Sequence, residues 1–451
     1  MEVIWAAWLR DRMRKDLLHY APSEFGGAIL AHVNDRGSHL RFLAVGLELP
    51  RPDEINVQGE DALWIDPGFW ARTAKQAKKQ KLALLPVHTH PFAHGVPQFS
   101  RVDRSGEQQL LPVLERLTAL PTAAIVLGPE GEAVERWTSG GEIITGRCRD
   151  IGTGPLVTDI DDLSKHAEEA EYNERFARHI RAFGRQGQRR LEALTVGVVG
   201  ASGTGSHVCE QLIRLGIGHL VVIDPDQVET VNLNRIVTAF TEDVMRDQSK
   251  VWAIKTYAEK VGDPTIVEAV QGTVLDRQTA AHLQTVDALF GCTDTLASRV
   301  ILNRLAIQCF IPYWDCGTEI SPGGQDLRAY GRVRLVLAGG ACLLCMGVID
   351  PERLRIELLP VAEREREVQL GYIRGTNLEA PAVVSLNAIT ASLAVMSFLR
   401  WAVGEQSLLP AQWVYRTYAG DVRRQTVEPQ SDCPVCRVGK RLGRADLDVS
   451  L

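Results

Sequence analysis

The sequence predicts an α/β protein with two domains, a smaller α+β domain over residues 1–150 and a Rossmann-like, doubly wound domain over residues 171–451. Short strand patterns with little helical periodicity fill the first domain. The second begins with a strand, a glycine turn, a helix and another strand. Between them, residues 151–170 belong to a stretch rich in Gly, Asp and Thr without a sustained period, which predicts a linker.

Composition argues against several classes of function. Charged residues make up 24% and hydrophobic residues 45% of the 451 residues, as is typical of a globular protein. The net charge of −6 argues against a nucleic-acid-binding surface. Charges come too early for a signal peptide, and we expect no apolar run long enough to span a membrane. We therefore expect a cytoplasmic protein.

The first 150 residues contain strand patterns and one helix pattern. The strand patterns are short and apolar, and they lie at residues 28–32, 40–45, 82–87 and 123–127. Residues 67–81 predict a helix that ends in lysines. The polar residues that follow the third strand are the most informative part of this domain.

Two histidines and a carboxylate have the spacing of metal ligands. His88 and His90 are two residues apart, so a strand presents both imidazoles on one side. Ser100-x-x-Asp103 has the form of a helix start capped by Ser100, and a helix packed near the strand end brings Asp103 to the histidines. Such a set leaves the fourth position of a tetrahedral zinc open, which is the catalytic arrangement, and Glu24 is our candidate base. Taken singly, each residue also fits a core histidine or a simple helix cap.

Together these residues resemble the JAMM metalloprotease motif of deubiquitinases and their bacterial relatives, over roughly residues 15–130. The resemblance implies a cytidine-deaminase-like fold with a catalytic zinc on His88, His90 and Asp103. It also implies that Glu24 is the general base and that Ser100 helps to hold the oxyanion.

The second domain opens with a turn that suits a phosphate. Gly200, Gly203 and Gly205 lie between a β-branched strand and a helix, where a backbone without side chains and the helix amides favour an anion. Asp224 ends the next strand, about 20 residues on, where a carboxylate accepts hydrogen bonds from ribose hydroxyls. A serine replaces the second glycine of the dinucleotide fingerprint, so the turn alone fits helix packing equally well.

Further polar residues favour ATP over a dinucleotide. Arg235, in the run Asn232-Leu-Asn-Arg235, and Lys250 are cations suited to a triphosphate, and Asp294 follows a predicted strand where it can hold Mg2+. The glycine turn, this D-x7-N-L-x-R segment, the lysine and the C-T-D run resemble the ubiquitin-activating-enzyme-like (ThiF-like) adenylyltransferase family over most of residues 172–436. The resemblance implies that Asn232 lies in the nucleotide site, and that Arg178 reaches the ATP phosphates across a homodimer.

Two Cys-x-x-Cys pairs predict a second metal. In a reducing compartment this spacing indicates metal rather than disulfides, and four thiolates make a closed, structural zinc site. The four residues are Cys342, Cys345, Cys433 and Cys436.

The charged stretch at residues 350–379 corresponds by resemblance to the family's crossover loop, over which the carrier's C-terminal tail passes. Relatives place a thioester-forming cysteine there, but the sequence has none between Cys345 and Cys433. Thr376 stands near that place. Its hydroxyl is either an ester-forming nucleophile or, as we favour, an ordinary loop side chain, since threonine needs activation.

The resemblances imply that ATP, with Mg2+, adenylates the C-terminal glycine of a ubiquitin-like protein, and that the zinc peptidase processes or deconjugates the same protein. A ubiquitin-conjugating-type enzyme is a possible further partner. The first alternative is a sulfur-carrier adenylyltransferase for cofactor or amino-acid biosynthesis. Two others are a nicotinamide oxidoreductase joined to an unrelated metal hydrolase, and a binding protein that only docks a carrier.

Overall fold

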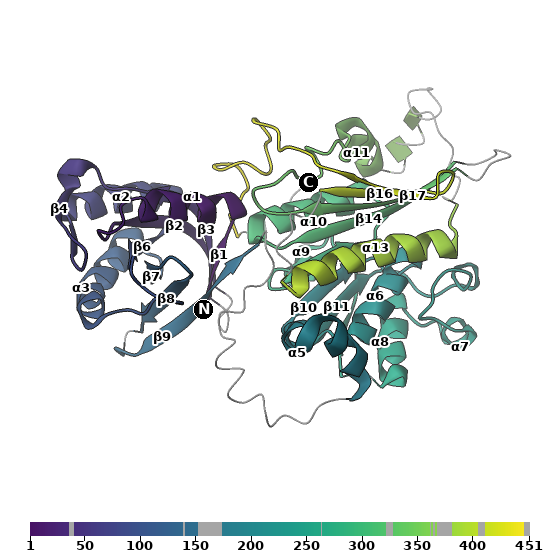
Figure 1. Cartoon of the computed structure of the whole chain (residues 1–451). Coiled ribbons are helices and arrows are strands. Elements are labelled where there is room, and N and C mark those ends of the chain that lie inside the picture. The colour runs from purple at the N-terminus through teal and green to yellow at the C-terminus, as the bar shows by residue number, and fades with distance from the viewer. Residues whose placement is uncertain are drawn as a thin grey trace. The chain divides into compact units, whose positions relative to one another are not determined.

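The chain divides into two compact units, Met1–Ala170 with Leu442–Asp446 and Glu171–Arg441 with Leu447–Leu451 (Figure 1). The computed structural model describes residues 1–35, 40–138, 140–151, 174–262, 264–321, 328–360, 362–363, 366–367, 381–404 and 411–445. The division therefore falls at the end of the predicted linker, of which only Ile151 is described.

The first unit is a mixed β-barrel with helices. Seven strands close in the order β1-β3-β2-β6-β7-β8-β9, and β4 and β5 form a separate hairpin. The strands are β1 (Glu2–Trp5), β2 (Gly26–Asp35), β3 (Leu40–Glu48), β4 (Ile55–Gln58), β5 (Leu63–Ile65), β6 (Ala83–Thr89), β7 (Ala124–Leu127), β8 (Glu132–Trp137) and β9 (Ile143–Asp150). The helices are α1 (Ala7–Leu18), α2 (Pro67–Gln80) and α3 (Arg101–Thr118), with a 3-10 turn at Pro52–Glu54. The α+β character is as expected, whereas the cytidine-deaminase-like fold stays a prediction.

Helix α1 is absent from the sequence prediction. Leu9, Met13 and Leu17 recur every four residues and are fully buried, so they form one apolar face against the barrel core. Charged residues separate them, and a stripe this narrow is a weak signal in the sequence. Helix α1 forms because its apolar face is buried against the barrel core, and not because its sequence has a strong helical period.

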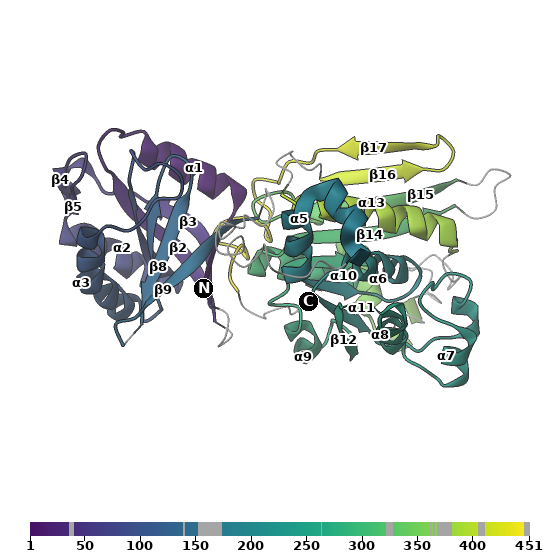
Figure 2. The same ribbon diagram turned by 60° about the horizontal axis from the view of Figure 1, so that its bottom comes forward.

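The second unit contains an eight-stranded sheet in the order β12-β11-β10-β13-β14-β15-β16-β17. The first five strands are parallel, which confirms the Rossmann-like prediction, and the last three are antiparallel extensions that end in the β16–β17 hairpin (Figure 2). The strands are β10 (Thr195–Val199), β11 (His219–Asp224), β12 (Ile266–Gln271), β13 (Ala288–Gly291), β14 (Tyr313–Ile320), β15 (Ala329–Val336), β16 (Gln412–Arg416) and β17 (Asp421–Gln425).

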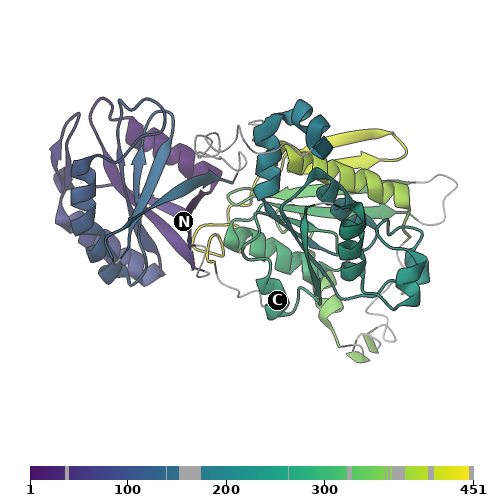
Figure 3. The ribbon, with the colours of Figure 1, turned by 90° about the horizontal axis from the view of Figure 1, so that it is seen from below.

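Helices cover both faces of this sheet (Figure 3). From β10 the chain runs through β11 to β12 on one side, and then returns to β13 on the other side of β10. Right-handed crossovers in opposite directions place α6 and α10 on opposite faces. The helices are α5 (Ala177–Ala193), α6 (Gly203–Leu215), α7 (Thr241–Met245), α8 (Lys250–Val261), α9 (Arg277–Ala281), α10 (Leu296–Cys309), α11 (Pro351–Leu358) and α13 (Val384–Ala402), with 3-10 turns at Glu174–Phe176 and Thr230–Asn232.

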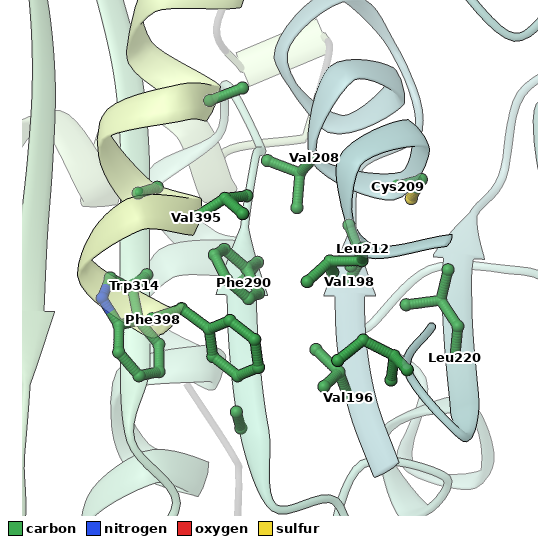
Figure 4. Close-up of a cluster of buried hydrophobic side chains, with 14 of the residues drawn as sticks. Val196, Val198, Val208, Cys209, Leu212, Leu220, Phe290, Trp314, Val395 and Phe398 are labelled. Carbon is green, nitrogen blue, oxygen red and sulfur yellow. The ribbon is translucent and has the colours of Figure 1, made fainter. Parts of the chain in front are cut away.

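The core of this unit lies between the sheet and the helices α6 and α13, which run side by side (Figure 4). Trp314 is fully buried, stacks on Phe290 and donates a hydrogen bond from its indole N–H to the Ser397 hydroxyl at 3.0 Å. Burial on both faces explains why the central parallel strands β10, β11 and β13 are mostly apolar. A rigid sheet therefore supports the polar residues at its edge.

Helix α13 is long and apolar enough to cross a membrane, judged by length and composition among the described residues. Half of its apolar window is buried, and Ala391, Val395 and Phe398 pack in the core of the sheet. This corrects the expectation that the chain has no such run. Packing against the sheet accounts for the apolar character of the helix.

Candidate functional site

The glycine turn of the second unit follows β10 and leads into α6. Gly200 has a φ of +94°, and a Cβ on it would lie 2.6 Å from the Cys292 carbonyl oxygen. A Cβ on Gly205 would lie 1.7 Å from the Gly200 carbonyl oxygen. Only glycine fits either position, so backbone amides rather than side chains line the start of the helix.

Asp224 ends β11 and is 5% exposed. Its two carboxylate oxygens accept hydrogen bonds from the backbone N–H of Ala201, at 2.7 Å, and of Asp226, at 2.9 Å. Burial raises the pKa of this carboxyl, although these amides and Lys250 favour the charged form. Asp224 therefore holds the glycine turn in place, and its contact with a ribose stays a prediction.

Two predicted cations lie close to this turn. Lys250 is the first residue of α8, is 7% exposed and donates to the Asp226 carboxylate at 2.7 Å. Arg235 donates to the Val231 carbonyl at 2.7 Å, and its Cδ lies 3.4 Å from the position of a Cβ on Gly203. Arg235 is thus against the first turn of α6, where a phosphate is favoured.

Asn232 and Arg178 have other surroundings. Asn232 is buried, and its side-chain oxygen accepts a hydrogen bond from the Glu229 N–H at 3.2 Å, which shapes the 3-10 turn that leads to Arg235. Arg178 is exposed on α5. Its predicted role requires a second subunit and stays a prediction.

Asp294 follows β13 and is exposed. The preceding carbonyl, of Thr293, accepts a hydrogen bond from Arg299 at 3.2 Å, and Arg299 pairs at 3.1 Å with the fully buried Asp315. Strand β13 lies beside β10, and β10 lies beside β11, so the residues after these strands share one edge of the sheet. The change of chain direction falls between β10 and β13, the usual ligand crevice of such folds.

Sequence reasoning missed Arg299 and Glu357, which hold the chain on either side of Asp294. Arg299 lies on α10, five positions after Asp294, and no motif in the sequence marks it. Glu357 accepts hydrogen bonds from the N–H groups of Leu296 and Ala297, at 2.8 Å each. No local signal predicts that contact, because 60 or more residues separate the partners.

The four predicted cysteines come together in one buried group. Their Sγ atoms all lie within 4.8 Å of one another, and three of the sulfur pairs are 3.6, 3.7 and 3.9 Å apart. Four sulfurs at 2.3 Å from a tetrahedral zinc are about 3.8 Å apart. The donor set and its spacing therefore fit a structural zinc, as predicted, held by Cys342, Cys345, Cys433 and Cys436.

The first unit also brings its predicted metal ligands together. The Nε2 atoms of His88 and His90 each lie 3.3 Å from an oxygen of Asp103. The buried His88 Nε2 is not aligned as a hydrogen bond to any group in the described ranges, so it is available to a metal. Burial alone would raise the pKa of Asp103, but the two histidines outweigh it and hold the pKa well below its usual range.

The predicted base and helix cap lie beside these ligands. An oxygen of Glu24 is 3.7 Å from His90 Nε2, and burial raises the pKa of the Glu24 carboxyl. Ser100 caps α3, as predicted, since its hydroxyl oxygen accepts from the Asp103 N–H at 3.1 Å. That contact leaves the hydroxyl hydrogen to donate elsewhere. Two histidines, a carboxylate and a nearby acid thus fit a zinc site of the open type.

Three features define the class of the second unit. They are a Rossmann-like sheet with a glycine turn at its switch point, polar residues along the same edge, and a four-cysteine group. The ThiF family model matches residues 176–435, more than half of the sequence, and the chain belongs to the ThiF family. The match begins after the histidine site of the first unit, whose assignment remains a proposal.

The relatives include an adenylyltransferase and sulfurtransferase MOCS3 from Anopheles gambiae, 30% identical over 204 residues, which covers 43% of this chain and 44% of that protein. A SAMP-activating enzyme E1 from Haloferax volcanii is 28% identical over 183 residues, covering 40% and 63%. The chain thus spans about half the length of the curated relatives it matches. A crystal structure of E. coli MccB with MccA-N7isoASN has a TM-score of 0.48 and 20% identity, covering 59% of this chain and 76% of that one.

Proposed function

We propose that the second unit transfers AMP from ATP to the C-terminal glycine carboxylate of a ubiquitin-like or sulfur-carrier protein. The observation that carries the proposal is that the glycine turn, Arg235 and Asp294 all follow neighbouring strands at one edge, with Lys250 tied to the same edge through Asp226. Membership of the ThiF family supports it, as do relatives named adenylyltransferase and E1.

The proposed reaction is a displacement at phosphorus. A carboxylate oxygen of the carrier forms a bond to the α-phosphorus of ATP, the bond to the bridging oxygen breaks, and pyrophosphate leaves. Lys250 and Arg235, with Arg178 from the other subunit of a homodimer, stabilise the charge that builds up on the phosphate oxygens. Mg2+, held by Asp294, would neutralise part of the triphosphate charge when bound.

We propose further that the first unit is a zinc peptidase that cleaves after the terminal glycine of the same carrier. His88, His90 and Asp103 would hold the metal, whose chemistry is to polarise a carbonyl and water. Glu24 takes a proton from the attacking water, and its raised pKa suits it to return that proton to the leaving amine. Ser100 donates its hydroxyl hydrogen to the oxyanion.

The fate of the adenylate distinguishes two versions of this function. A conjugation pathway attaches the carrier to lysines, and a sulfur pathway converts its terminus to a thiocarboxylate. The absence of a cysteine between Cys345 and Cys433 favours the sulfur version, and so does the name sulfurtransferase among the relatives. Thr376, the other candidate nucleophile, lies outside the described residues. Mass spectrometry of a carrier incubated with ATP, the protein and a sulfide source separates the two products.

Carrier-dependent exchange between ATP and pyrophosphate tests the central step. We expect exchange with the wild type and a loss of at least about 100-fold in Lys250→Ala, because a charge stabiliser of the transition state is removed. Lys255→Ala is the matched control, since Lys255 lies over the Trp252 ring on the same helix and should leave exchange unchanged. Wild-type exchange in Lys250→Ala, or tight NAD binding with no exchange, would contradict the proposal.

A further inference from the structure

The turn that carries Asp294 runs directly into helix α10. Thr295 is the residue before the helix, and its hydroxyl oxygen accepts from the Ser298 N–H at 3.3 Å. This contact satisfies one of the free amides that every helix leaves at its start. The amides of Leu296 and Ala297 remain to be satisfied by something else.

A side chain from a distant element satisfies both of them. The two carboxylate oxygens of Glu357, on α11, accept from the N–H of Leu296 and of Ala297, at 2.8 Å each. An anion at this end of a helix is favoured by the aligned peptide dipoles, and a charged acceptor strengthens both hydrogen bonds. Glu357 thus ties α11 to the residues that immediately follow Asp294.

The residue that precedes Asp294 is tied from another direction. Arg299 donates to the Thr293 carbonyl, and its guanidinium is fixed by Asp315, which has no exposed surface and is also paired with Arg334 at 2.8 Å. A buried carboxylate with two arginines does not move without leaving a charge unpaired. The chain on both sides of Asp294 is therefore held, although the Asp294 side chain is exposed.

We propose that Glu357 is a positioning residue for Asp294, which it orients for Mg2+ and ATP by fixing the start of α10. The inference rests on the adenylation proposed above and extends it to a residue that touches neither nucleotide nor metal. A metal ligand is effective only if its carboxylate is held close to the productive geometry, and that is the task of the groups behind it. Without the Glu357 carboxylate, both amides lose a charged acceptor, and a neutral glutamine can replace only one of the two oxygens, so the turn gains freedom.

The dependence of the exchange reaction on Mg2+ tests this. We expect Glu357→Gln to raise the Mg2+ concentration for half-maximal exchange about ten-fold, the lower end of what the loss of a group behind a metal ligand costs in metal affinity. Glu352→Gln is the matched control, because Glu352 lies on the same helix and pairs on the exposed surface with Arg355. A purely structural role would lower the melting temperature and rate but leave the Mg2+ requirement unchanged, and this result would overturn the proposal.

Hydrogen exchange of the backbone separates this inference from the proposed function. In full-length Glu357→Gln, the amides of Leu296 and Ala297 should exchange faster than in the wild type and in Glu352→Gln, whether or not the protein adenylates a carrier. Equal hydrogen exchange of these amides in all three proteins refutes the positioning role even if adenylation is demonstrated. If the two amides exchange hydrogen faster but the wild type shows no exchange between ATP and pyrophosphate, then Glu357 does hold the start of α10 and the proposed adenylation is wrong.

Discussion

At the scale of single residues, the surroundings of Glu24 determine its proposed role as a base. Its carboxyl lies 3.7 Å from His90 Nε2, and burial raises its pKa, so it is placed to exchange protons beside the proposed metal ligands. His88 and His90 share one side of the end of β6, which is a local property, and the sequence therefore predicts it. The approach of Glu24 and Asp103 depends on packing between distant elements, so sequence alone could offer it only through a family resemblance.

Glu24→Gln should retain zinc but lose cleavage of a carrier extended beyond its terminal glycine, by at least about 100-fold, because the amide cannot accept the proton of water. Metal analysis and a cleavage assay on the purified protein measure the two effects. His94→Ala serves as the control, since His94 is exposed in the loop that follows the site. A variant that holds only the zinc of the four-cysteine group would mean that Glu24 is a ligand and not a base.

Glu107, one helical turn beyond Asp103, makes stability depend on pH. Burial raises its pKa to about 8, and one of its oxygens has no hydrogen-bond partner in the described ranges. Because the folded state binds this proton more tightly, the contribution to stability is complete below about pH 4.5 and is lost as the pH rises towards 8. No sequence pattern marks Glu107, since it occupies an ordinary helix position.

Glu107→Gln mimics the protonated side chain, so its free energy of unfolding should fall less between pH 6 and pH 9 than that of the wild type. At pH 9 we expect the variant to be more stable by roughly 2 to 4 kcal/mol, measured by urea unfolding. Glu142→Gln, at an exposed site, should follow the wild type. Parallel pH profiles for Glu107→Gln and the wild type would show that Glu107 is not protonated when buried.

At the scale of elements, the sequence predicts best where a short stretch carries its own signal. The pattern strand, glycine turn, helix and strand appears in the predicted order as β10, α6 and β11. Helix α1 and the closure of the first sheet are missed, because a narrow apolar stripe and the pairing of β1 with β9 are decided by contacts far apart in the chain. The two Cys-x-x-Cys pairs are predicted because each spans only four residues. The contact between the pairs is not local, since 91 residues separate the partners.

Cys433→Ser should release the structural metal and destabilise the second unit, lowering its melting temperature by roughly 10 °C or more, since such sites contribute directly to folding. Calorimetry with and without a chelator gives the measurement. The chelator should shift the melting transition of the second unit in the wild type towards that of the variant, and should leave this transition unchanged in the variant. An identical melting curve for wild type and variant would argue against a structural zinc.

At the scale of the whole molecule, the proposed role of Arg178 requires two copies of the chain. Arg178 is exposed on α5, where it is free to serve the site of a second subunit in the proposed homodimer. The assignment of Arg178 comes from the family resemblance alone, because its side chain is exposed and no hydrogen bond within the described ranges marks it. Oligomeric assembly is thus the level at which sequence and single-chain geometry say least.

Mixing Arg178→Ala with Lys250→Ala tests whether Arg178 of one subunit acts in the site of the other subunit. Each variant alone should be inactive, but a mixed dimer contains one site with both native residues, so a random mixture should recover about a quarter of the wild-type exchange rate. Co-expression with two different affinity tags allows the mixed dimer to be purified and assayed. If the mixture stays inactive, Arg178 acts within its own subunit or takes no part in the reaction.

The four-cysteine group closes the chain into a ring, since Cys342 meets a partner 91 residues later. Helices α11 and α13 and the β16–β17 hairpin all lie within that ring. Fastening the ends of so long a loop removes much of the freedom it would otherwise have. Loss of this zinc would therefore loosen the attachment of α11, and with it the hold of Glu357 on the start of α10. The supply of zinc would then determine how well the proposed site at Asp294 binds Mg2+.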